Sequence, residues 1–103
     1  MKQIERIEQM EQCFDVSEEA VRALSDALDR YEEAQKTLKK LCDYYGGTLW
    51  RKDFEADEAG KLPAGLKRGV LSEDSVYDLL TEHHEMVLRM SRAVTKAIDG
   101  KLL

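Results

Sequence analysis

The stretch GGTLWRKDFEADEAGKLPAGLKRGVL, residues 46–71, divides the chain into two helical parts and decides how the fold is organised. It contains the single tryptophan, the single proline and five of the six glycines among the 103 residues. Two helices of a plain hairpin need only about 2–8 residues of connection. A connection of 26 residues with this composition therefore predicts a structured insert between two helices.

The residues before the insert follow a heptad repeat whose a and d positions are mostly apolar. The a positions are Ile7, Phe14, Val21, Leu28, Gln35 and Cys42, and the d positions are Met10, Ser17, Leu24, Tyr31, Leu38 and Tyr45. Only Ser17 and Gln35 are polar, and a narrow stripe of this kind packs against another helix. The pattern predicts one long helix over about 2–45. Because Asp15 and Glu18 resemble a capping box, a break near residues 15–17 is the alternative.

The residues after the insert predict a second long helix over about 72–99. Ser72 is a suitable N-cap, and Leu71 and Val76 have the spacing of a hydrophobic staple around it. From Val76 onward apolar residues recur every three or four positions, as they do on one face of a helix.

The structured insert, residues 46–71, predicts a short helix over about 48–59 and then an irregular segment. Thr48 is the expected N-cap of this short helix, and Gly60 is its expected end. The irregular segment contains apolar residues that favour burial. We therefore expect the insert to pack over the ends of the two long helices.

The predicted fold class is all-α, with residues 1–103 forming a single domain. Two long antiparallel helices form a helical hairpin, with the short helix and a structured loop between them. Because the first helix is the longer one, it would overhang by roughly 20 Å and leave Ile4, Ile7 and Met10 exposed. We expect a second chain to cover these residues, so that a homodimer extends the hairpin into a coiled-coil bundle.

Charge and composition argue against several kinds of partner. The formal net charge of −5 disfavours nucleic acid, since such binding depends on Lys and Arg neutralising phosphates. No apolar run approaches the ~20 residues of a membrane span, and charges within the first ten residues argue against a signal peptide. We expect a cytoplasmic protein that binds neither nucleic acid nor membrane. Cys13 and Cys42, roughly 43 Å apart on a continuous helix, are expected to be buried reduced thiols.

The central block YYGGTLWRKDFEADEAGKLPAGLKRGVLSEDSVYDLL, residues 44–80, resembles the shared block of a small bacterial domain-of-unknown-function family of helical proteins. The motif RIEQME at residues 6–11 and the tyrosine at Tyr31 also fit, so the resemblance covers nearly the whole chain. It implies a cytoplasmic bacterial α-helical protein. It implies no activity, no cofactor and no catalytic residue.

Acidic residues of the insert are candidate ligands for a divalent metal. Asp53 and Asp57 lie four residues apart and share one helix face, and His83 would add an imidazole. Because no HxxxH or ExxH spacing accompanies them, pairing of these carboxylates with nearby Arg and Lys is the stronger interpretation. A small anion site built from the basic residues of the insert is a weaker alternative.

The sequence contains no nucleophilic or acid–base constellation, so we expect a non-enzymatic protein–protein interaction or adaptor module. The residues of the expected interaction surface are Trp50, Phe54, Lys67, Arg68 and Tyr77. The competing structural interpretation makes the aromatic side chains a core, with Trp50 packed on Tyr45 and Tyr77. The alternative function is a small-ligand or divalent-metal-binding protein that uses the acidic insert and the histidine pair, His83 and His84.

Overall fold

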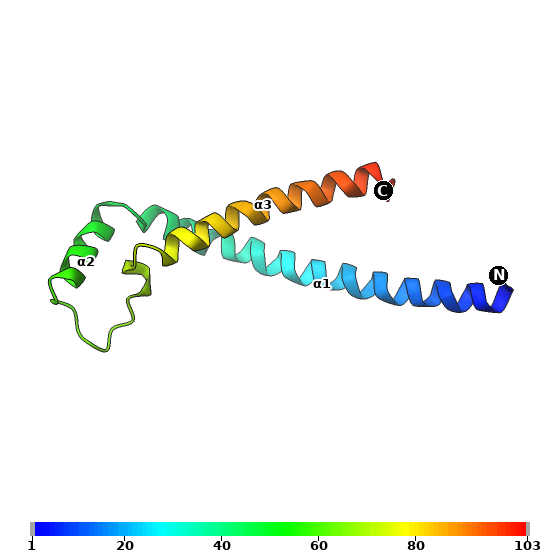
Figure 1. Cartoon of the computed structure of the whole chain (residues 1–103), viewed down its shortest axis with the longest axis horizontal. Helices are drawn as coiled ribbons and strands as arrows, with labels where there is room; N and C mark the ends of the chain where they lie inside the picture. Colours follow the sequence, from blue (N-terminus) through cyan, green and yellow to red (C-terminus); the bar gives the residue numbers. More distant parts are fainter. Residues whose placement is uncertain (1, 103) are drawn as a thin grey trace. The chain divides into compact units, whose positions relative to one another are not determined.

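The computed structural model describes residues 2–102 and contains three α-helices and one 3-10 turn in that range (Figure 1). In chain order they are α1 (Gln3–Tyr44), α2 (Thr48–Glu58), the turn η1 (Gly69–Leu71) and α3 (Ser75–Asp99). The predicted all-α class is confirmed, since residues 2–102 contain no strand. The chain divides into a first unit, residues 1–40, and a second unit, residues 41–103. The hairpin and the homodimer stay predictions.

The first unit consists of α1 alone, and the helix continues into the second unit. α1 does not break near residues 15–17, because no glycine or proline occurs before Gly46. None of its described residues is buried, and every residue from 2 to 30 is exposed. The expectation that Cys13 and Cys42 are buried is therefore wrong, since both thiols are exposed. An apolar heptad position is buried only where another element packs over it.

No helix within residues 2–102 combines the length and the apolar character that a membrane crossing requires.

A pair of glycines makes the turn between α1 and α2. Gly46 has a φ of +76°, a left-handed conformation that favours glycine. Gly47 is the N-cap of α2 with an extended backbone, and its N–H donates to the Tyr44 carbonyl oxygen at 3.1 Å. The prediction that Thr48 caps this helix is wrong, because the turn through Gly46 makes Thr48 the first helical residue.

α2 ends in a Schellman motif around Gly60. The Gly60 N–H donates to the Asp57 carbonyl oxygen at 3.0 Å, and the Lys61 N–H donates to the Ala56 carbonyl oxygen at 3.0 Å. Both bonds satisfy carbonyl groups that have no partner within the helix itself. Gly60 has a φ of +70°, as the left-handed position of this motif requires.

Gly60→Ala is expected to lower the free energy of unfolding by about 1–2 kcal/mol. A Cβ at Gly60 would have no atom within 4 Å, so the cost comes from the left-handed backbone alone. Gly65→Ala is the matched control, because a Cβ there also meets nothing within 4 Å and its φ is not positive. We expect that variant to be unchanged or about 0.4–1 kcal/mol more stable. Urea denaturation followed by far-UV circular dichroism measures the free energy of unfolding of both variants. Equal losses of stability would contradict the conclusion that the left-handed backbone at Gly60 causes the effect.

η1 and the residues after it lead the chain into α3. Ser72 Oγ accepts a hydrogen bond from the Ser75 N–H at 3.0 Å and donates one to Ser75 Oγ at 2.7 Å. The prediction that Ser72 is the N-cap of this helix is wrong, because residues 73 and 74 form a turn and the N-cap is Asp74. Leu71 and Val76, the predicted staple residues, are 5% and 4% exposed. They are the two buried residues in the described part of the chain and form the small core of the second unit.

Candidate functional site

An aromatic cluster lies in the second unit, where α2 follows the end of α1. It consists of Tyr45, Trp50 and Phe54, all half-buried. The rings of Tyr45 and Trp50 meet edge to face with centroids 5.3 Å apart, and those of Trp50 and Phe54 stack at 5.1 Å. Both arrangements suit the charge distribution of aromatic rings. Trp50 therefore packs on Tyr45, as the structural interpretation expected, whereas Tyr77 is 62% exposed.

Hydrogen bonds from this aromatic cluster reach segments that come later in the chain. Trp50 Nε1 donates to the Val70 carbonyl oxygen at 2.9 Å, which joins α2 to η1. The Tyr45 hydroxyl donates to the Glu73 carbonyl oxygen at 3.2 Å, which joins the end of α1 to the start of α3. η1 also contacts both α2 and α3. These hydrogen bonds hold the residues that follow the irregular segment 61–68 next to the aromatic cluster.

The Tyr44 hydroxyl donates a short hydrogen bond to Asp53 Oδ2 at 2.6 Å. A charged acceptor makes such a bond stronger than one between neutral groups. This bond, together with burial and the negative charge of Asp53, raises the pKa of Tyr44 from 10.0 to about 12. Each of these influences favours the neutral phenol. The stabilisation is therefore fully present below pH 10 and is lost as the pH rises through about 12.

The Asp53→Asn variant is expected to move the pKa of Tyr44 from about 12 down toward 10.0, because the charged acceptor is removed. The measurement is a tyrosinate absorbance titration, with the curve of Tyr44→Phe subtracted to isolate this one phenol. Far-UV circular dichroism at each pH shows that the fold is intact. A pKa that stays the same in Asp53→Asn would contradict the proposed role of the carboxylate.

The acidic residues considered as metal ligands have other partners. Arg68 Nη1 lies 3.1 Å from Asp57 Oδ1, as the structural interpretation of this carboxylate expected. Asp53 instead accepts from a tyrosine hydroxyl, a partner that charge alone did not suggest. His83 is half-buried on α3. Within residues 2–102, no three His, Cys, Asp or Glu side chains gather as a metal site requires.

A mainly apolar groove of about 420 Å³ lies next to η1 in the second unit. Its lining residues are Leu41, Lys67, Gly69, Val70, Ser75, Val76 and Leu79. Of the predicted interaction residues, Lys67 lines the groove. Leu41, Val70 and Leu79 were not among the predicted residues, since they come from three separate elements. The signal in the sequence that could have indicated the groove was an apolar residue, Val70, outside any predicted helix.

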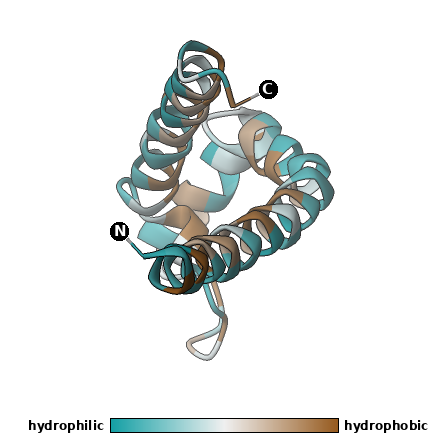
Figure 2. Ribbon diagram, turned by 90° about the vertical axis from the view of Figure 1, so that its right-hand side faces the viewer, coloured by the Kyte–Doolittle hydropathy of each residue, from teal (hydrophilic) through white to brown (hydrophobic). Residues whose placement is uncertain are grey.

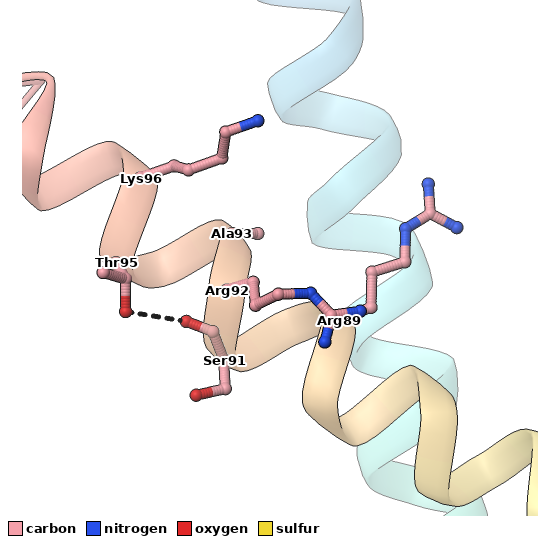
Figure 3. Close-up of a pocket in the computed structure, with 6 residues that line it drawn as sticks. All are labelled: Arg89, Ser91, Arg92, Ala93, Thr95 and Lys96. Carbon is pink, nitrogen blue, oxygen red and sulfur yellow. Dashed lines mark hydrogen bonds between the residues drawn. The ribbon is translucent and has the colours of Figure 1, made fainter.

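A hollow of about 550 Å³ follows the C-terminal half of α3 (Figure 3). Its lining residues are Arg89, Ser91, Arg92, Ala93, Thr95 and Lys96. Thr95 Oγ1 donates to the Ser91 carbonyl oxygen at 3.1 Å, a common bond for threonine in a helix. All six residues are exposed, so the three cations are solvated and form no enclosed anion site.

α1 presents a long exposed apolar stripe, which we call the α1 seam. Its residues are Ile7, Met10, Phe14, Val21, Leu24 and Leu28. Their exposed fractions range from 36% to 65%. Figure 2 shows the same pattern, with hydrophobic residues in brown recurring between hydrophilic ones in teal along the helices. Exposed apolar surface arranged in this way makes α1 a candidate surface for packing against another helix.

The sequence matches one protein-family model over most of its length. The matched residues, 7–93, include most of α1, the whole insert and most of α3. No curated protein and no solved structure matches the chain. The matched model is described as a domain of unknown function (DUF4298), which confirms the resemblance found in the sequence. Because this model covers well over half of the residues, the chain belongs to the DUF4298 family.

Proposed function

We propose that the protein is a non-enzymatic protein–protein interaction module that self-associates through the α1 seam. The exposure of the six large apolar side chains of this seam carries the proposal. Fully burying one such side chain contributes about 1.5–3 kcal/mol. A second copy of the chain presents the same heptad stripe along α1, so a homodimer covers the seam without any further component.

Small-ligand or metal binding at the acidic insert is less well supported. Asp53 Oδ2 already accepts a hydrogen bond from the Tyr44 hydroxyl. Asp57 Oδ1 already pairs with the Arg68 guanidinium, and a positive charge disfavours a second cation beside it. The side chains of the α1 seam, by contrast, are exposed.

We also propose that the module acts in the bacterial cytoplasm. The family resemblance supports this location.

The test is the mass of the protein in solution by sedimentation equilibrium. We expect the wild type to have twice the 11.8 kDa of one chain. Leu24→Gln, in the middle of the seam, should weaken self-association by roughly two orders of magnitude, because two buried leucines are lost per dimer.

Ala23→Gln is the matched control, since Ala23 is exposed on α1 and lies outside the seam. It should leave the dimer constant within a few-fold, while far-UV circular dichroism reports equal helix content for both variants. A wild-type mass of 11.8 kDa would refute self-association. Equal weakening by the two substitutions would refute the seam as the interface.

A further inference from the structure

We propose that two α1 helices pair antiparallel, in a register that places Ser17 of one copy opposite Gln35 of the other. The inference rests on the proposed self-association and adds its orientation and register. It starts from the two polar positions in an otherwise apolar heptad stripe. Both residues are exposed on α1, which is continuous between them.

The register follows from how a and d positions meet. In an antiparallel pair, a positions of one helix face d positions of the other. Pairing Ser17 with Gln35 then brings together five combinations of apolar, aromatic or Cys positions within the same overlap. They are Ile7 with Tyr45, Met10 with Cys42, Phe14 with Leu38, Val21 with Tyr31, and Leu24 with Leu28, each occurring twice by symmetry. The crossing point falls close to Asp26, near the middle of α1.

Shifting the pair by one heptad separates the two polar residues. In one direction Ser17 faces Leu28 and Gln35 faces Met10. In the other direction Gln35 faces Leu24. A buried polar group without a hydrogen-bond partner is strongly unfavourable, whereas a serine hydroxyl and a glutamine amide satisfy each other. Single polar residues in such stripes are known to specify register.

The orientation follows from the distribution of charge along α1. Residues 2–20 contain six acidic and two basic side chains, a net charge of −4. Residues 34–45 contain three lysines and one aspartate, a net charge of +2. An antiparallel pair places each acidic segment beside a basic one. A parallel pair would place the two acidic segments side by side, which like-charge repulsion disfavours.

Cysteine cross-linking distinguishes these arrangements. The background variant carries Cys13→Ala and Cys42→Ala, so that the introduced thiols are the only ones. Ser17→Cys and Gln35→Cys are then made singly and together. Because 18 residues separate them, these thiols lie roughly 27 Å apart within one helix and cannot form an intramolecular disulfide. The variants are mildly oxidised and run on a non-reducing gel.

We expect the double variant to give a covalent dimer, because position 17 of each copy then meets position 35 of the other. Each single variant should stay monomeric on the gel, since its two thiols are again roughly 27 Å apart in the antiparallel pair. Far-UV circular dichroism and sedimentation of the reduced variants show that helix and dimer persist.

Dimer formation by the single variants would establish a parallel pair and overturn the inference, while self-association would stand. Absence of cross-linking in all three variants would also overturn it. In that case the wild-type mass separates the two explanations. A dimer would mean another register or interface, and a mass of 11.8 kDa would mean that the chain does not self-associate, so that the proposed function fails as well.

Discussion

Trp50→Ala is expected to lower the free energy of unfolding of the second unit by about 3–5 kcal/mol. The substitution removes the ring that stacks on Phe54 and meets Tyr45, with centroids 5.1 and 5.3 Å away. It also removes the donor to the Val70 carbonyl oxygen. Since small domains have total stabilities of about 5–15 kcal/mol, the loss is a large fraction of the whole.

The measurement is urea denaturation followed by far-UV circular dichroism, with hydrogen exchange to locate the loss. Leu49→Ala is the neighbouring control, because Leu49 is 68% exposed, and we expect a change within about 0.5 kcal/mol. Trp50→Phe keeps an aromatic ring but loses the bond to Val70, so it should cost about 1–3 kcal/mol. A Trp50→Ala variant as stable as Leu49→Ala would show that the cluster does not hold the insert in place.

Leu71→Ala is expected to cost about 2–5 kcal/mol, the second large effect. Leu71 is 5% exposed at the end of η1, between α2 and α3. Truncation leaves a cavity in a core whose other buried residue, among those described, is Val76. With so small a core, little else remains to compensate for the loss.

Leu66→Ala serves as the control for Leu71→Ala, since both remove the same atoms and Leu66 is 49% exposed. Thermal unfolding should shift clearly to lower temperature for Leu71→Ala and only slightly for Leu66→Ala. Similar shifts would mean that the buried position contributes no more than the surface one. That outcome would contradict the assignment of Leu71 and Val76 as the core.

Much of the fold could be predicted because its signals are local. The heptad pattern and the absence of glycine before Gly46 predict a long first helix. Ser72 was expected to cap the second long helix, yet this helix begins at Ser75 with Asp74 as its N-cap. The difference arises because residues 73 and 74 form a turn, so that the Asp74 carbonyl oxygen accepts the helical bond from the Asp78 N–H at 2.8 Å.

The candidate site was less predictable, because its contacts join residues that are distant in the sequence. Asp53 and Asp57 share a helix face, and that spacing alone equally suits a metal or two cations. The structure gives Asp53 a tyrosine hydroxyl and Asp57 a guanidinium. Tyr77 was expected beside Trp50 but is exposed. The position of a residue along a helix does not determine whether its side chain faces another element or the solvent.

The sequence by itself determined where the helices lie, where glycine ends them and which faces are apolar, because these depend on neighbouring residues. Only the tertiary structure decided the partners of the insert. The irregular segment 61–68 has no periodic pattern of apolar residues from which its path could be predicted. Its end is held in place by the hydrogen bond from Trp50 Nε1 to the Val70 carbonyl oxygen. The same holds for burial, because a heptad position such as Cys13 is apolar by sequence but exposed until another helix covers it.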